Sequence, residues 1–413
     1  MDPSMTGHLI RRSLLALSLL LPLSGLIGCQ STMVETAETP VLTDYDRPLP
    51  PGQRALRLIT DPARLPDLEA AYREHSAIFM QSLERSIGWF DKPSSLEWFP
   101  MEGVSHARAK ASVIAMREVL ASSTSPQDFA RRVRSTFDVY ESVGYDGSGT
   151  VLFTGYYSPE FAGSPTRTAR FTAPLYRRPA DLATDPRTGA PLGRQRADGT
   201  TTSYPSRREI ERSGMLAGTE IAWVEDRLAA YLIHVNGSAK LRLPDGSTMH
   251  IGYDGKTDRP YRSLGKAIIR EGLAPADGMS ITAIRRLYRK NPAPIDELMN
   301  ENESFVFFTE YAGSDWPAGS LGVRVSPECS LATDKTIFPR GGVVLVDTHA
   351  PRFTGGLRPY ARLMLDQDTG GAIRAPGRAD IFMGIGETVG ILAGRQHAEG
   401  QLYYFFVRDD GAS

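Results

Sequence analysis

Between residues 68 and 136 apolar positions recur at the three- and four-residue spacing of one helix face. A first apolar stripe predicts one helical segment, and a second helix is predicted over 107–120. A third helix begins at Ser125-Pro126, because Ser caps a helix N-terminus and Pro fits its first turn. These helices carry no chemical motif, so we interpret them as structural. The residues of the first stripe are Leu68, Tyr72, His75, Phe79, Leu83 and Ile87.

From Val151 onward the pattern changes to short apolar segments separated by turn residues. Two alternating segments flank Pro244-Asp245-Gly246 and predict a β-hairpin. Ser206 and Glu209 form a capping box that opens a short helix, which Gly214 can close. Many short strands with few helices between them favour barrels over a doubly wound parallel sheet. The predicted strands are 151–159, 240–243, 248–251, 305–308, 343–346, 362–365, 381–383 and 402–407.

The first thirty residues have the pattern of a secretory signal. Arg11 and Arg12 precede an apolar run over 14–23, which is shorter than the roughly 20 residues that a spanning helix needs. Cys29 follows Leu-Ile-Gly and resembles the lipobox of bacterial lipoproteins, in which this Cys is acylated. Gln30 after it favours, by the same resemblance, sorting to the outer membrane. We therefore predict a signal peptide over 1–28 and a lipid-anchored chain.

Composition and charge indicate which classes of protein and which kinds of site the chain does not resemble. The stretch 29–55 holds the lipidated Cys and a polar, proline-marked tether. A net charge of −1 lacks the basic footprint of a nucleic-acid binder. Cys329 is the single cysteine besides Cys29, so no internal disulfide is predicted. The seven His are scattered, which indicates neither a metal site nor a cofactor, and His234 in an apolar segment read as strand is interpreted as a core residue.

The candidate chemistry lies near the C-terminus. Asp368 and Asp380 border a glycine-rich segment between two apolar runs, which predicts strand, turn, strand. Two carboxylates on a rigid frame suit acid/base chemistry on a glycosidic bond. The same residues are also common turn formers, since Asp tolerates bends and Gly adopts positive φ. The motif by itself leaves both interpretations open.

Several motifs in consistent order resemble the membrane-bound lytic murein transglycosylase A family. They are the lipobox, FTGYYSPEF at 153–161, YPSRREIE at 204–211, Asn236-Gly237-Ser238 before LRLPDG, and DTGGAIRAPGRADIF at 368–382. The C-terminal block also resembles the 3D domain, named for three aspartates, which match Asp334, Asp368 and Asp380 here. In our alignment the turn between Asp368 and Asp380 is one residue longer than in the best-known members, around Pro376-Gly377.

The resemblance implies a mainly β fold with N-terminal helices. A double-psi β-barrel catalytic domain would comprise 56–157 and 301–413, its C-terminal part being the 3D domain. A smaller β-barrel domain would be inserted over 158–300, with a groove for the glycan strand between the two.

The resemblance also implies non-hydrolytic cleavage of the β-1,4 bond between N-acetylmuramic acid and N-acetylglucosamine in peptidoglycan, in cell-wall turnover and recycling. Asp380 would protonate the leaving oxygen and then deprotonate the C6 hydroxyl, giving a 1,6-anhydro end. An acid working near neutrality needs its pKa raised by burial or a like charge. Asp368 and Asp334 would support Asp380.

Further residues are candidate contacts to the glycan. Tyr156 and Tyr157 are expected to stack on sugar rings, although strand tyrosines are often plain core residues. Arg374 and Arg207 are candidates for the carboxylates of peptide stems. The remaining candidates, matched by resemblance, are Gly370, Gly371, Ala372, Asn236 and Ser238. The expected partners are peptidoglycan glycan strands, outer-membrane lipid through acylated Cys29 and wall-synthesis proteins, in the periplasm of a Gram-negative bacterium.

Three alternatives stay open. Asp368-Thr369-Gly370 is the triplet of aspartic proteases, but those need two such triplets and this chain has one. An inverting β-1,4-glycan hydrolase on the same barrel would need a base roughly 6.5–9.5 Å from the acid. A non-catalytic peptidoglycan-binding lipoprotein would keep the groove and lose the acid, which the presence of Asp380 argues against.

Overall fold

The computed structural model describes residues 43–186, 189–276, 279–313, 315–371 and 373–409. The predicted signal peptide, Cys29 and most of the predicted tether lie outside these residues, as does Ala372. In the described part no helix is long and apolar enough to cross a membrane.

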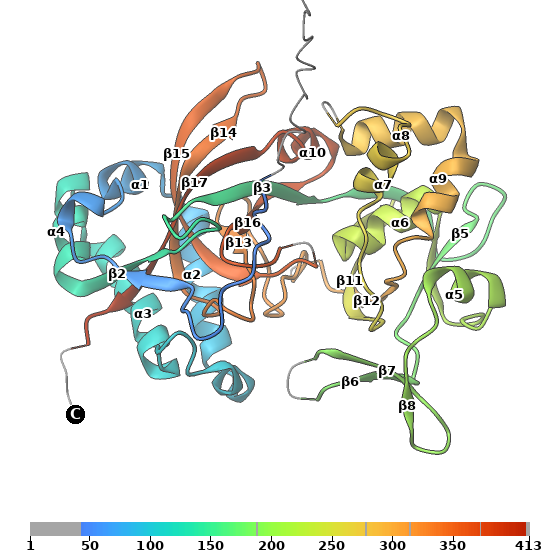
Figure 1. The fold of residues 1–413 in the computed structure, drawn as a ribbon, viewed down its shortest axis with the longest axis horizontal. Coiled ribbons are helices and arrows are strands. Elements are labelled where there is room, and N and C mark those ends of the chain that lie inside the picture. Colours follow the sequence, from blue (N-terminus) through green and yellow to red (C-terminus); the bar gives the residue numbers. More distant parts are fainter. Residues whose placement is uncertain (1–42, 187–188, 277–278, 314, 372, 410–413) are drawn as a thin grey trace, which may run out of the picture. The chain divides into compact units, whose positions relative to one another are not determined.

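The larger sheet has eight strands in the order β1-β2-β17-β14-β15-β13-β16-β3 (Figure 1). Because β17 pairs with both β14 and β3, six of these strands close into a ring. β13 runs parallel to β15 and β16 parallel to β3, so the ring mixes strand directions. The strands are β1 Leu56–Leu58, β2 Phe137–Ser142, β3 Val151–Ser158, β13 Ser330–Ala332, β14 Val343–Pro351, β15 Leu357–Asp368, β16 Arg378–Ile385 and β17 His397–Val407.

Helices cover this ring and complete its core. Val343, Val344, Leu345 and Val346 on β14 are all fully buried, although successive strand residues face opposite sides. One side of β14 faces the ring and the other is covered, because α3 packs against β14 and β17. This continuous apolar run is the pattern of a strand buried on both faces. The helices around the ring are α1 Leu68–Glu74, α2 Ala77–Phe90, α3 His106–Ser122, α4 Pro126–Thr136 and α10 Glu387–Ala393, with 3-10 turns at Pro62–Arg64 and Pro93–Trp98.

The predicted N-terminal helices are confirmed with one correction. The apolar stripe that predicted one helix from Leu68 to Ile87 is divided between α1 and α2. The break falls where Ser76 adopts extended backbone and its side chain accepts from the Phe79 amide. A local N-cap thus interrupts the helix while the apolar spacing continues through it. The expected cap at Ser125 is present on α4.

A second sheet has six strands in the order β12-β11-β10-β4-β9-β5. The predicted hairpin around Pro244-Asp245-Gly246 is confirmed as the antiparallel pair β10–β11. The strands are β4 Glu160–Ser164, β5 Ala173–Tyr176, β9 Glu220–Val224, β10 Ser238–Arg242, β11 Thr248–Lys256 and β12 Val306–Tyr311, and a separate small sheet holds β6 Leu182–Thr184, β7 Pro191–Gln195 and β8 Thr201–Thr202.

Five helices accompany these smaller sheets. The capping box is confirmed at the start of α5, which ends at Gly214 in the left-handed conformation (φ 66°). His234 is 5 % exposed, as expected of a core residue, but it lies in α6 and not in a strand. The helices are α5 Arg207–Ser213, α6 Arg227–Asn236, α7 Leu264–Arg270, α8 Ile281–Lys290 and α9 Pro292–Met299.

The predicted class, mainly strands with N-terminal helices, is therefore confirmed. The apolar residues form separate clusters, one around the eight-stranded sheet and others within the part that contains β4 to β12. The double-psi arrangement and a groove between domains stay predictions.

Candidate active site

The two predicted acids lie on one row across the eight-stranded sheet. Ala332 on β13 is the register partner of both Asp368 on β15 and Asp380 on β16. Asp380 in turn pairs with Thr154 on β3. Directly paired residues project from the same face of a sheet, so these side chains share one face. The sequence predicted strand, turn, strand here, and the structure adds that β13 lies between the two strands.

Asp380 has few compensating contacts. Its Oδ1 accepts a hydrogen bond from the Thr154 hydroxyl at 3.0 Å. Burial raises the pKa of Asp380 to about 7, and the like charge of Asp368 adds to this effect. The Thr154 hydrogen bond and the charge of Arg378 oppose the rise. At neutral pH this carboxyl is therefore present in both protonation states, which is the condition for donating and then accepting a proton.

Asp368 is held by more donors. The Tyr156 hydroxyl donates to its Oδ2 at 2.6 Å, and the Ser320 and Thr369 amides donate to its Oδ1 at 2.8 Å. Burial raises the pKa of Asp368, while these hydrogen bonds and the charge of Lys335 act against the rise. The arrangement favours an oriented carboxylate that can stabilise positive charge nearby.

Asp334 shapes the connection between β15 and β16. It is 5 % exposed, and its Oδ1 accepts from the amide and hydroxyl of Thr336 at 3.0 and 2.7 Å. Its Oδ2 accepts from the Ala375 amide at 2.9 Å, where Ala375 has a positive φ of 65°. The guanidinium of Arg374 lies 3.8 Å from the same carboxylate. Asp334 therefore ties the end of β13 to the loop that carries Arg374.

The turn between Asp368 and Asp380 is also anchored at its far end. The Ser142 hydroxyl donates to the Pro376 carbonyl at 2.9 Å, and the Leu152 amide donates to the Gly377 carbonyl at 2.9 Å. A side chain at position 377 would collide with Tyr145, because an added Cβ would lie 2.5 Å from its Cβ. These contacts fix the position at which β16 begins, two residues before Asp380.

A buried ionic network next to this row was missed by the sequence analysis. Asp366 is fully buried two residues before Asp368 and forms an ion pair with Lys335. The Tyr404 hydroxyl donates to Asp366 Oδ2 at 2.8 Å, and the Thr333 hydroxyl donates at 2.9 Å. Thr333 also donates its amide to the Asp368 carbonyl at 3.2 Å. An aspartate at the end of the apolar run Leu363-Met364-Leu365 was the available signal.

The two candidate tyrosines have different environments. Tyr156 is partly exposed, and its ring lies 5.1 Å from that of Phe382. Tyr157 is 7 % exposed and packs against α10, since a Cβ on Gly390 would lie 2.7 Å from its ring. Tyr156 is thus joined to the aspartate row through Asp368, whereas the ring of Tyr157 lies against a helix.

Three of the remaining candidates, Arg207, Asn236 and Ser238, make their hydrogen bonds away from the aspartate row. Arg207 is 2 % exposed, and its guanidinium donates to the Asn302 and Ser304 carbonyls at 3.0 and 2.7 Å. Asn236 donates its side-chain amide to the Leu232 carbonyl, and the Ser238 hydroxyl lies 3.3 Å from that of Ser158 at the end of β3. Gly370 and Gly371 lie in the turn after Asp368, separated from it by Thr369, and Gly371 has open space where a side chain would be.

In the described part of the chain, no group of three or more His, Cys, Asp or Glu side chains is arranged to hold a metal ion. The fold and the site together are those of a strand-built protein that carries a carboxyl with a raised pKa in its larger sheet, the kind of group found at acid/base sites.

Comparison with known proteins identifies the family. The family model described as the MltA specific insert domain matches residues 152–309, and the 3D domain matches residues 329–406. Membrane-bound lytic murein transglycosylase A of Escherichia coli (strain K12) is 31 % identical over 272 residues, which cover 64 % of this chain and 68 % of the relative. The Vibrio cholerae protein of the same name is 30 % identical over 266 residues, covering 63 % and 66 %.

Solved structures agree with this result. A membrane-bound lytic murein transglycosylase from Agrobacterium tumefaciens is 26 % identical, with a TM-score of 0.69 over 86 % of this chain and 98 % of that one. Escherichia coli MltA with bound chitohexaose is 23 % identical, with a TM-score of 0.66 over 89 % and 100 %, and shows a likeness of fold. The chain belongs to the membrane-bound lytic murein transglycosylase A family.

Proposed function

We propose that this protein is a peptidoglycan lytic transglycosylase in which Asp380 is the general acid and then the general base. The observation that carries the proposal is the desolvated carboxyl of Asp380, whose pKa is raised to about 7 on a row shared with Asp368. Family membership supports the substrate, because the curated relatives are named for murein. The MltA structure with bound chitohexaose supports a glycan ligand for this fold.

The proposed reaction keeps its proton balance within the site. Protonated Asp380 donates its proton to the glycosidic oxygen as the bond from C1 to that oxygen breaks. The C6 hydroxyl of the same N-acetylmuramic acid attacks C1, and Asp380 takes the hydroxyl proton. The products are a free 4-hydroxyl end and a 1,6-anhydro end, and Asp380 is again protonated. The intramolecular attack replaces the water and the second catalytic base of an inverting hydrolase.

Asp368 and Asp334 have supporting roles in this proposal. Asp368 is oriented by Tyr156 and two amides, so its charge can stabilise the positive sugar in the transition state. Asp334 holds the loop at Ala375 and Arg374. Tyr156, Gly370, Gly371 and Ala372 are the proposed glycan contacts near Asp368. Tyr157, Arg207, Asn236 and Ser238 remain candidates for the wider glycan surface.

We also propose the domain division and the location. The catalytic domain would be 56–157 with 301–413, and 158–300 would be the insert, which the match over 152–309 supports in outline. Strand β12 (Val306–Tyr311) belongs to the six-stranded sheet, and the next strand, β13, belongs to the eight-stranded sheet. The chain therefore leaves the smaller sheet for the larger one after Tyr311. Acylated Cys29 would anchor the protein to the outer membrane facing the periplasm, in keeping with the membrane-bound relatives.

The decisive experiment is product analysis on purified sacculi. Wild type is expected to release fragments with 1,6-anhydro ends, which mass spectrometry distinguishes from the reducing ends of a hydrolase by the mass of one water. Asp380→Asn is expected to release almost nothing. Asp347→Asn is a matched control, because Asp347 on β14 is also a partly buried strand carboxyl with a raised pKa. Reducing ends would support the inverting hydrolase, and equal release by wild type and Asp380→Asn would support a binding protein.

A further inference from the structure

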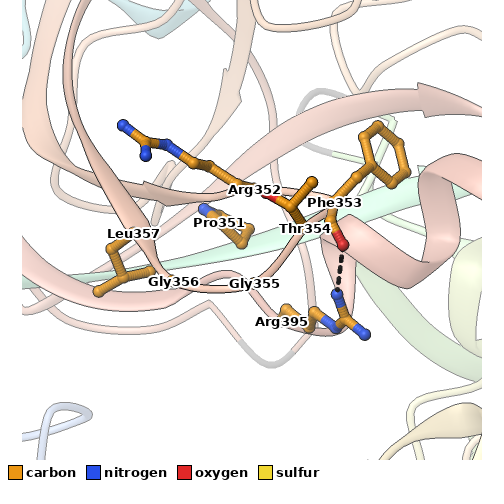
Figure 2. A pocket seen from close by; sticks show the side chains of 8 residues that line it. All are labelled: Pro351, Arg352, Phe353, Thr354, Gly355, Gly356, Leu357 and Arg395. Carbon is orange, nitrogen blue, oxygen red and sulfur yellow. Dashed lines mark hydrogen bonds between the residues drawn. The ribbon is translucent and has the colours of Figure 1, made fainter.

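The β14–β15 hairpin ends in an exposed apolar and cationic tip that the proposed reaction does not use. Phe353 is 59 % exposed and Leu357 is 52 % exposed, the former being the largest fraction among the described large apolar side chains. Arg352 lies beside Phe353, and Arg395 after α10 borders the same hollow (Figure 2). No acidic side chain lines this hollow, whose residues are Pro351, Arg352, Phe353, Thr354, Gly355, Gly356, Leu357 and Arg395. We call residues 351–357 with Arg395 the hairpin tip.

The turn holds these side chains outward. The Arg352 amide donates to the Gly356 carbonyl at 3.0 Å, and the Gly355 amide donates to the Arg352 carbonyl at 3.1 Å. Gly355 and Gly356 have φ of 91° and 75°, which glycine adopts without strain. The Arg395 guanidinium donates to the Phe353 carbonyl at 3.5 Å, and Figure 2 shows the Phe353 ring extending away from the loop. The tip is therefore a formed structure that exposes apolar surface before any partner arrives.

Hydrogen bonds through Glu399 connect the strand that leads to the tip with the first described residues of the chain. The Tyr45 hydroxyl donates to Glu399 Oε1 at 2.7 Å, and the Glu399 carbonyl accepts from the Thr348 hydroxyl at 2.7 Å. Thr348 precedes the first residue of the tip, Pro351, by about 10 Å of extended strand. Residues 30–44 separate Cys29 from Tyr45, and this length of chain can span at most about 55 Å. A lipid on Cys29 would therefore keep the tip within reach of the bilayer.

We propose that the hairpin tip is a membrane-docking surface for anionic phospholipid. Phe353 and Leu357 would enter the interface between headgroups and acyl chains, while the guanidinium groups of Arg352 and Arg395 meet lipid phosphates. Aromatic and aliphatic side chains flanked by arginine are the composition of interfacial membrane anchors. Single exposed apolar residues are ordinary on protein surfaces, but here two lie on one turn with only cationic charge beside them. The docking would orient the body on the bilayer to which Cys29 is tethered.

Vesicle binding tests this surface without the lipid anchor or catalysis. The unlipidated chain from Gln30 onward keeps every described residue, and it is co-sedimented with vesicles of phosphatidylglycerol and phosphatidylethanolamine, or of phosphatidylcholine alone. Wild type is expected to bind the anionic vesicles, less so at high salt. Phe353→Asp with Leu357→Asp is expected to lower the partition coefficient at least ten-fold, and Arg352→Gln or Arg395→Gln about five-fold each.

A matched control separates this effect from general surface chemistry. Leu192→Asp changes a leucine of 51 % exposure on β7, outside the hairpin tip, and is expected to bind vesicles like wild type. All variants are expected to keep wild-type activity on soluble glycan strands, so loss of the proposed enzymatic function would appear separately. Absence of vesicle binding by wild type, or equal binding by Phe353→Asp/Leu357→Asp, would overturn the proposal. A dimer in sedimentation that this double variant dissolves would also overturn it, assigning the tip to a second copy of the chain.

Discussion

Two neighbouring regions of the eight-stranded sheet surround an aspartate with different numbers of hydrogen-bond donors and counter-charges. In the buried network Asp366 has Lys335 as counter-charge and accepts hydrogen bonds from Tyr404 and Thr333. In the aspartate row Asp380 accepts a hydrogen bond from Thr154 alone among the described residues. Burial raises the pKa of Asp380 to about 7, because the Thr154 hydrogen bond and the charge of Arg378 offset only part of the desolvation.

The difference teaches how one sheet separates structure from chemistry. A buried carboxylate with an ammonium partner and several hydroxyl donors holds neighbouring strands together. A buried carboxyl with one donor holds its proton to higher pH and can give it up during a reaction. The counter-charge and the donors around each carboxyl therefore differ between the two regions, although every residue compared is an aspartate. A substitution in the aspartate row should therefore affect catalysis, and a substitution in the Asp366 network should affect stability.

The largest effect is expected from Asp380→Asn. An asparagine of the same shape cannot donate the proton, so kcat for release of anhydro ends should fall by roughly 10²–10⁴. The melting temperature at pH 6 should change little, which distinguishes loss of chemistry from loss of fold. Retention of more than a tenth of wild-type activity would remove Asp380 from the role of acid.

Lys335→Met tests the buried network around Asp366 and is expected to lower the stability of the fold. It leaves Asp366 buried without a counter-charge, which costs about 3–5 kcal/mol in the free energy of unfolding. Denaturant titration measures this cost. Adding Asp366→Asn should recover part of it, because the isolated charge is removed. A double variant no more stable than Lys335→Met would contradict the proposed pairing.

The raised pKa of Asp380 predicts how activity and stability change with pH. Activity should fall as pH rises through about 7, approaching ten-fold per pH unit, because Asp380 must carry a proton to begin the reaction. The folded-state pKa of Asp380 lies above the ordinary value of 3.8, so the folded protein holds more protons between these pH values. The stability associated with this residue is therefore lost as pH rises from about 4 to about 7. Asp380→Asn should flatten that decline, which unfolding curves at pH 5 and pH 8 would detect.

Tyr156→Phe should give the smallest of these effects. It removes the 2.6 Å hydrogen bond to Asp368 and raises the pKa of that carboxyl, so activity should fall roughly ten-fold. Tyr360→Phe on β15 is the control, because the buried Tyr360 hydroxyl has no hydrogen-bond partner in the described structure. That control should keep activity and leave stability unchanged or slightly higher. Equal activity of both variants would show that Tyr156 does not orient Asp368.

Local signals in the sequence predicted much of the framework. The Ser125 cap, the capping box at Ser206 and the hairpin around Pro244 depend on residues close in the chain, and all three are confirmed. The break at Ser76 was missed because the apolar stripe continues through it. His234 was expected in a strand, although its burial was predicted correctly. An apolar segment of that length fits either element, so periodicity could not decide.

The sequence by itself identified Asp368 and Asp380 as a pair around a glycine-rich turn. The motif fitted either acid/base chemistry or a plain turn, and the family resemblance implied acid/base chemistry. Only the tertiary structure placed β13 between their strands, set Thr154 opposite Asp380, and gave Asp366 the counter-charge of Lys335. The physical reason is that desolvation and hydrogen bonding depend on residues that are distant in the chain, 31 positions for Lys335 and Asp366 and 226 for Thr154 and Asp380. Composition and spacing identify the carboxylates, but only the packed sheet supplies the burial that raises the pKa of Asp380.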